Sequence, residues 1–128
     1  MTLFVPNPHV KSYSDATVVP VGAGALVFVA GQLGVPGEAA SNDLSLPFED
    51  EVTACFRNLE AVLGKSGATV RQLVRTDTFL SDLSLYPLFA KVRSQFIGED
   101  PPASTLVEAT LLKGARVEIA AVAFVPKA

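Results

Sequence analysis

The stretch that decides the fold is residues 101–125, which read PPASTLVEATLLKGARVEIAAVAFV. Two β-type runs flank a Lys113-Gly114 break, and the two leading prolines exclude a helix at the start of the first run. The second run alternates between two faces, and both faces are apolar from Ile119 onward. We therefore expect a strand near the C-terminus that is covered on both sides.

Glu118 lies where this second run enters its apolar part. A carboxylate at the edge of a buried region needs either a partner or a shifted pKa, which makes Glu118 the most informative single residue of the chain. If Lys113-Gly114 is the tip of a two-residue hairpin, Glu118 pairs with Ala109, and Thr105 pairs with Val122 on the same face.

The composition describes one apolar domain spanning residues 1–128. Hydrophobic residues make up 49% of the chain and charged residues only 18%, against roughly a quarter charged in ordinary soluble domains. No apolar run reaches the ~20 residues of a membrane-spanning helix without charges, prolines or glycines. The surplus of apolar side chains instead predicts a subunit interface, and hence a homo-oligomer.

Charge and residue counts exclude several classes of function. The net charge is −3, and the 10 basic residues are scattered, so a nucleic-acid partner is not expected. Cys55 is the only cysteine and His9 the only histidine, so we expect no disulfide, no metal site and no bound cofactor. No leader segment is recognisable after Met1, and a cytoplasmic location is the default expectation.

Hydrophobic periodicity predicts an α+β fold in the order β-β-α-β-α-β-β, with two helices on one face of a mixed sheet. The predicted segments are an irregular start at 1–16, a hairpin of 17–21 and 25–30, a loop at 34–46, a helix from about Pro47 to Gly64, a strand at 73–80 and a helix at 84–96. The second helix is expected to bury Leu85, Leu88, Phe89, Val92 and Phe96. Local chemistry alone supports no enzyme class.

Individual residues leave some alternatives open. Cys55 lies on the apolar stripe of the first helix and is interpreted as a core residue rather than a nucleophile. Gly31 is either a turn residue or a point where a ligand approaches the backbone closely. Arg75 and Asp77 share one face of their strand, as a solvated or mutually paired couple.

Several segments, in this order and spacing, resemble the RidA/YjgF family of small trimeric proteins. The matching segments are Tyr13-Ser14-Asp15-Ala16, Val27–Leu33, Asn58-Leu59, Ala61–Leu63, Gly67-Ala68, Val74–Leu83, Pro101–Val107 and Val117–Ala123. The resemblance covers nearly the whole chain from Tyr13 to Val125. It implies a chorismate-mutase-like trimer with a central barrel, helices outside and ligand clefts between neighbouring subunits.

The resemblance also implies a chemistry. Studied members hydrolyse reactive imines and enamines to 2-oxo acids and ammonia without a cofactor. An arginine after the Pro-Ala of the fifth-strand motif clamps the substrate carboxylate, and a glutamate of the last strand positions or polarises the attacking water. A tyrosine near the start of the chain and backbone groups near a Gly-Gln turn complete the cleft.

Carried over position by position, Tyr13, Gly31 and Glu118 match this pattern, but Ser104 occupies the place of the arginine. A serine offers neither a positive charge nor a fork of donors. A polar residue of the family's second helix is likewise replaced by Ala90. The cations that could substitute are Arg75, Arg93 and Arg116.

The leading hypothesis is therefore a RidA-like hydrolase acting on a small imine, enamine or related carbonyl metabolite other than the usual 2-imino acids. Glu118 is the expected catalytic residue. Tyr13, Gly31, Ser104, Thr105 and Leu106 are the expected substrate-binding residues. The alternative is a trimer that binds a small metabolite without converting it, and a ribonuclease, which some family names suggest, has little support from the acidic composition.

Overall fold

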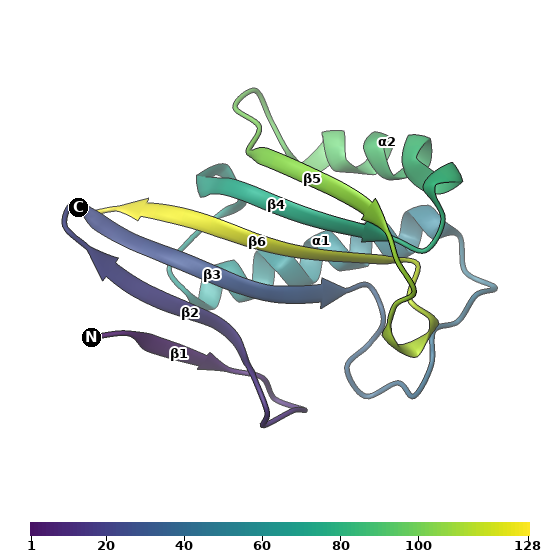
Figure 1. Cartoon of the computed structure of the whole chain (residues 1–128), viewed down its shortest axis with the longest axis horizontal. Helices are drawn as coiled ribbons and strands as arrows, with labels where there is room; N and C mark the ends of the chain where they lie inside the picture. Colours follow the sequence, from purple (N-terminus) through teal and green to yellow (C-terminus); the bar gives the residue numbers. More distant parts are fainter.

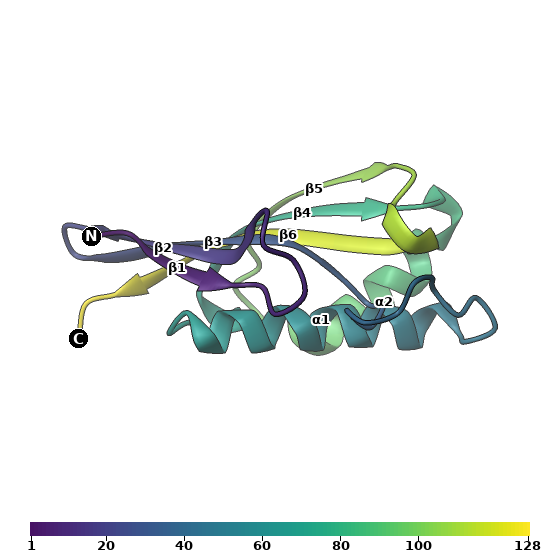
Figure 2. The ribbon, with the colours of Figure 1, turned by 90° about the horizontal axis from the view of Figure 1, so that it is seen from below.

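A computed structural model describes residues 1–128 as a six-stranded sheet with two α-helices packed on one of its faces (Figure 1). Seen edge-on in Figure 2, both helices lie below the sheet, and the opposite face is open. The elements are β1 (Leu3–Pro6), β2 (Ser14–Val21), β3 (Gly24–Leu33), α1 (Phe48–Lys65), β4 (Leu73–Leu80), α2 (Tyr86–Phe96), β5 (Ala103–Glu108) and β6 (Val117–Pro126), with 3-10 turns at Val70–Gln72, Leu83–Leu85 and Leu112–Gly114. The predicted α+β class, with two helices on one face of a mixed sheet, is confirmed.

The strand order is β1-β2-β3-β6-β4-β5. All neighbouring pairs are antiparallel except β4 and β5, which are parallel and joined through α2. Such a crossover returns the chain to the same sheet on the side of its helices. The C-terminal strand β6 is inserted between β3 and β4. Within one chain only one of its faces is covered: Val117, Ile119, Ala121 and Ala123 are buried on the helix side, and the alternate residues are partly exposed on the open face.

Helix α1 is amphipathic as predicted. It follows Pro47, carries Glu49, Asp50 and Glu51 in its first turn, where acidic groups favour the helix dipole, and ends before Gly67, which has a positive φ of 81°. All six residues of the predicted stripe are buried: Val52, Cys55, Phe56, Leu59, Val62 and Leu63. They pack against the inner residues of β3 and β6, so the core lies between α1 and the middle of the sheet.

Three expectations were wrong in detail. Residues 1–16 are not wholly irregular, because β1 pairs with β2 along the sheet edge. Leu88 is 38% exposed rather than buried, since α2 turns mainly Phe89 and Val92 inward. The hairpin around Lys113-Gly114 does not form: β4 lies between β5 and β6, and Glu118 is opposite Phe79 of β4 and Leu33 of β3.

Candidate functional site

The residues predicted for the site divide between the two faces of the sheet. Ser104 and Leu106 share the register and face of Thr76 and Thr78, which are buried under the helices. Thr105 and Glu118 belong to the alternate positions of β5 and β6 and face the open side. Strand alternation therefore separates Ser104 from Glu118 by a full sheet thickness, in addition to the intervening strand β4.

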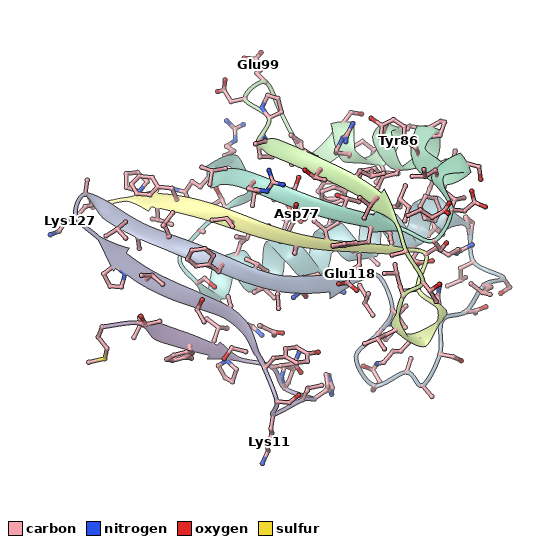
Figure 3. All side chains as sticks on the ribbon, viewed as in Figure 1. Lys11, Asp77, Tyr86, Glu99, Glu118 and Lys127 are labelled. Atoms are coloured by element: carbon pink, nitrogen blue, oxygen red, sulfur yellow. The ribbon has the colours of Figure 1, made fainter.

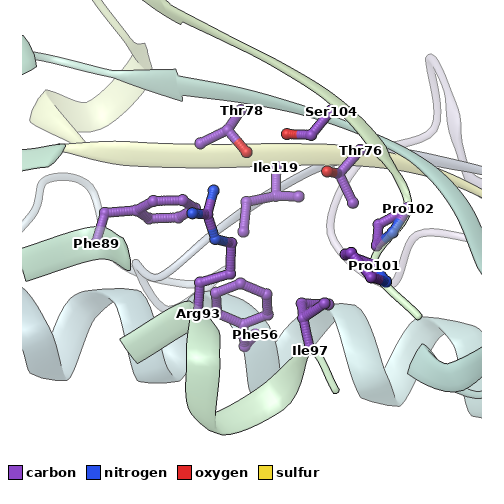
Figure 4. Close-up of a pocket in the computed structure, with 10 residues that line it drawn as sticks. All are labelled: Phe56, Thr76, Thr78, Phe89, Arg93, Ile97, Pro101, Pro102, Ser104 and Ile119. Atoms are coloured by element: carbon purple, nitrogen blue, oxygen red, sulfur yellow. The ribbon is translucent and has the colours of Figure 1, made fainter. Parts of the chain in front are cut away.

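A pocket of about 250 Å³ opens between β5, α2 and the sheet on the helix side (Figure 4). Its polar lining consists of Thr76, Thr78, Ser104 and Arg93. The remaining lining is apolar: Phe56, Phe89, Ile97, Pro101, Pro102 and Ile119. Ser104, at the position of the family arginine, is thus on the wall of a real cavity.

The neighbours of Ser104 on β5 have different surroundings. Leu106 is half-buried and packs against the hydrophobic core. The hydroxyl oxygen of Thr105 accepts a hydrogen bond of 2.8 Å from Arg75, whose NH2 group also contacts an Asp77 oxygen at 2.9 Å. Arg75, Asp77 and Thr105 form a polar cluster on the open face, where Figure 3 shows Asp77 on the same side of the sheet as Glu118.

The three arginines proposed as substitute cations occupy three different environments. Arg75 is paired with Asp77 on the open face. Arg116 pairs at 2.7 Å with Glu51, which is 5% exposed and also accepts hydrogen bonds from the Arg116 backbone N–H and from Asn42. Arg93 alone of the three lines the pocket that contains Ser104.

The buried Glu51 network has a positioning role for the site. It ties the first turn of α1 and the loop at Asn42 to Arg116, two residues before Glu118. Arg116 also donates to the Leu46 carbonyl at 2.9 Å. The start of β6, and with it the backbone of Glu118, is therefore fixed by charge-assisted hydrogen bonds.

Glu118 is a half-buried carboxylate that forms no ion pair within the chain. Burial raises its pKa above the ordinary value, because a charged carboxylate loses hydration there. It lies directly against the backbone of Gly31, at a bulge of β3: a Cβ at Gly31 would overlap the carboxylate and come within 2.8 Å of its Cδ. Gly31 and Glu118 are thus brought together, and only glycine leaves room for the carboxylate.

Cys55 lies near this carboxylate but is a core residue. It is fully buried, and its thiol donates to the Gln32 carbonyl oxygen at 3.0 Å. Burial, reinforced by the negative charges of Glu51 and Glu118, raises the pKa of the thiol far above its ordinary value. A thiol that stays protonated is a poor nucleophile, so Cys55 has no covalent role here.

Tyr13 lies in the loop before β2 and is 51% exposed. Between β2 and β5 lie β3, β6 and β4, so Tyr13 and Ser104 are separated by roughly 19 Å at about 4.8 Å per strand spacing. Side chains cannot bridge that distance within one chain. The structure brings Glu118 to Gly31, and Ser104 to Arg93, but does not join these two groups or Tyr13.

Sequence reasoning missed the threonines of the pocket and left Arg93 unplaced. A signal for both was present. Thr76 and Thr78 alternate in phase with Leu80, which marks their face of β4 as the buried one. Arg93 follows Phe89 by four residues, which places both on the same side of α2.

Other kinds of site find no support in these side chains. No group of three or more potential metal ligands occurs. Neither helix is both long and apolar enough to cross a membrane.

Comparison with known proteins gives consistent matches over the whole chain. The model of the family described as Endoribonuclease L-PSP matches residues 6–125. A 2-iminobutanoate/2-iminopropanoate deaminase of Dermatophagoides farinae is 33% identical over 120 residues, covering 92% of this chain and 88% of that protein.

Solved structures agree with these matches. RidA of an Antarctic Psychrobacter species superposes with a TM-score of 0.78 at 29% identity, covering 94% of each chain. Rv2704 of Mycobacterium tuberculosis, described as a member of the YjgF/YER057c/UK114 family, gives a TM-score of 0.77 at 30% identity and covers 98% of this chain and 100% of that one. From its sequence and its fold, this chain belongs to the RidA/YjgF family, the Endoribonuclease L-PSP family of the sequence model.

Proposed function

We propose that this protein hydrolyses a small imine or enamine in a cleft completed by a second copy of the chain, with Glu118 activating the water. The observation that carries the proposal is the unpaired, half-buried Glu118 against the Gly31 backbone, with its pKa raised by burial. Such a carboxylate is suited to general acid–base chemistry. The family and a relative named as an imine deaminase support this reaction class.

The reaction needs no external reagent except water. The Glu118 carboxylate accepts a proton as the water oxygen bonds to the imine carbon, and the C=N double bond becomes a single bond. The protonated carboxyl then returns its proton to the nitrogen of the carbinolamine. The carboxylate then takes the proton of the carbinolamine hydroxyl and gives it to the amino nitrogen as the C–N bond breaks. This step releases ammonia, leaves a C=O double bond in the product and returns the glutamate to its starting state.

The separation of the two half-sites supports a cleft between copies. Within one chain, Glu118 and Ser104 face opposite sides of the sheet, and Tyr13 is roughly 19 Å from Ser104. The open face also carries exposed Phe28 and Val107, both 43% exposed. We propose that the open face packs against neighbouring copies in a homotrimer, as the family resemblance implies, and that the β5 edge of one copy, with its pocket, adjoins the glutamate of another copy.

The usual 2-imino acids are proposed to be poor substrates. A charge-assisted bidentate contact is worth about 1.5–3 kcal/mol, so a serine in place of the strand arginine should lower 2-iminopropionate hydrolysis by about 10- to 150-fold. The comparison is with a relative that has the arginine, measured under the same conditions. Equal rates in the two proteins would contradict this part of the proposal.

A coupled assay tests the reaction. An amino-acid oxidase generates a range of 2-imino acids, and semicarbazide traps whatever survives. A deaminase lowers the yield of semicarbazone, and Glu118→Gln should abolish that effect, whereas Glu38→Gln, at an exposed loop glutamate, should not. If no imine is consumed faster with the protein than without it, the hydrolase proposal fails in favour of the non-catalytic metabolite-binding trimer.

A further inference from the structure

The pocket under β5 contains one cation and no anion. Arg93 is its only charged lining residue, and none of the four ion pairs of the chain includes Arg93. One NH2 group donates to the Tyr86 hydroxyl at 3.1 Å, and the guanidinium carbon lies 5.4 Å from the Phe89 ring centroid. These contacts hold the side chain in place but use few of its five N–H donors.

The opposite wall offers hydroxyl groups to the cavity. Thr76 is 6% exposed and Thr78 3% exposed, and both line the pocket. No side-chain oxygen or nitrogen is sealed off without a hydrogen-bond partner, so these hydroxyl groups are open to the cavity. Figure 4 shows Arg93 extending from α2 beside Phe89 toward the sheet, where Thr78, Thr76 and Ser104 line the cavity. A hydroxyl group on a cavity wall can donate one hydrogen bond to a ligand and accept others, so this wall can hold a polar group of a ligand.

The rest of the wall limits the ligand. Its apolar part is formed by rings and branched side chains, with Phe56 and Ile119 at the base of a space of about 250 Å³. That surface suits a ligand with a small apolar body. A single cation with neutral hydroxyls suits one negative charge better than the two charges of a phosphate monoester.

From these contacts we infer that Arg93 binds the carboxylate of a small monocarboxylic acid with an apolar side chain, in place of the arginine that Ser104 has replaced. The cation thus comes from the helix wall of the pocket rather than from the strand. A carboxylate held by Arg93 is displaced from the position set by a strand arginine. Misplacement by about 1 Å can cost 10²-fold in rate, which is consistent with a changed substrate rather than a lost one.

This inference rests on the proposed function in one respect, the statement that the bound acid is a substrate. Binding of the acid itself is measured without any reaction. The probe is 4-methyl-2-oxopentanoate, titrated calorimetrically into the full-length protein. Its neutral counterpart is 4-methyl-2-oxopentanamide, which has nearly the same shape. We expect the acid to bind about 10- to 150-fold more tightly than the amide.

The decisive variant is Arg93→Gln, which should remove that preference while leaving binding of the amide unchanged. Arg57→Gln is the matched control: Arg57 is also helical and lies 4.9 Å over an aromatic ring, that of Phe96, but it is outside the pocket. It removes the same charge and should keep the preference. Arg93→Lys should restore part of it, because the charge returns without the fork of donors.

Three results would overturn the inference. They are equal binding of acid and amide to the wild type, an unchanged preference in Arg93→Gln, and no binding of either probe. The comparison of acid with amide needs no variant, so it remains decisive if Arg93→Gln does not fold. Carboxylate binding without imine hydrolysis would refute the proposed function alone, and hydrolysis without carboxylate preference would refute this inference alone.

Discussion

Replacing Ser104 by arginine should restore hydrolysis of small 2-imino acids only when Arg93 is removed as well. Ser104 and Arg93 line the same pocket, which contains no carboxylate. A second guanidinium group in this pocket would repel that of Arg93, because no carboxylate lies between the two positive charges. The double variant Ser104→Arg/Arg93→Gln instead returns the pocket to one cation, on the strand.

The magnitude follows from Coulomb's law. If the two guanidinium groups are taken to lie about 8 Å apart across the pocket, they repel by about 2 kcal/mol at an effective dielectric constant of 20, and by about 0.5 kcal/mol in water. Ser104 is exposed in the single chain, so the lower value applies there, and the higher value applies once a second copy covers the pocket. At about 4 °C per kcal/mol for a chain of this size, Ser104→Arg should melt about 2–8 °C below wild type.

Thermal melting and the semicarbazide assay are run on four proteins: wild type, each single variant and the double variant. The double variant should hydrolyse 2-iminopropionate about 10- to 150-fold faster than wild type, the value of one bidentate contact, and should recover most of the lost melting temperature. If Ser104→Arg alone gains full activity without destabilisation, the proposed closeness of the two positions is wrong. A double variant that gains nothing would show that the pocket is shaped for another ligand.

Three further predictions concern the other half-site and the assembly. Gly31→Ala should displace the Glu118 carboxylate and lower imine hydrolysis at least 10-fold at nearly unchanged melting temperature, because the clash falls on a flexible side-chain end; unchanged activity would contradict this. Folding raises the pKa of Glu118, so its charged carboxylate destabilises the folded protein at a pH above that pKa. Glu118→Gln should therefore raise the melting temperature at pH 7 but not at pH 4. A lower melting temperature of the variant at pH 7 would refute this prediction. Light scattering at micromolar concentration should give three times the chain mass of 13.4 kDa, and a monomer mass would reject the trimer.

Much of the fold was predictable because its elements have strong local patterns. The apolar stripe of α1 and the alternation of β4 have unmistakable periods, and both segments form within a residue or two of the predicted bounds. Strand β1 has only four residues, ends at Pro6 and is soon followed by Pro8, so its pairing with β2 depends on tertiary contact rather than on local preference.

The short sequence separation between β5 and β6 did not predict how these two strands pair in the sheet. Two β-type runs around Lys113-Gly114 look like a hairpin, and both residues do have positive φ angles, 61° and 68°. Elements outside the turn determine the pairing: α2 returns β5 to the outer edge of β4, and β6 takes the central position between β3 and β4. The sequence of the Lys113-Gly114 turn does not show that a helical crossover places β5 parallel to β4.

Properties of single candidate residues could be read from the sequence, but their arrangement in space could not. The position of Glu118 at the edge of an apolar run indicated a carboxylate with either a partner or a shifted pKa, and the fold favours the second, because burial raises the pKa of Glu118. The placement of Arg75, Arg93 and Arg116 depended on which neighbours each would meet. Arg75 pairs with Asp77, and Arg116 pairs with Glu51. Only the fold shows that Arg93 lines a pocket without a carboxylate.

The placement of Ser104 and Glu118 on opposite faces makes the proposed enzyme testable by complementation. If each cleft takes its pocket from one copy and its glutamate from another, a chain without Glu118 can still supply a sound pocket, and a chain with a spoiled pocket can still supply a sound glutamate. Two inactive variants, unfolded together and reassembled in equal amounts, would then form about a quarter of their clefts from two intact halves. Recovered activity on mixing dead proteins would report the architecture of the cleft directly, without any structure of the assembly.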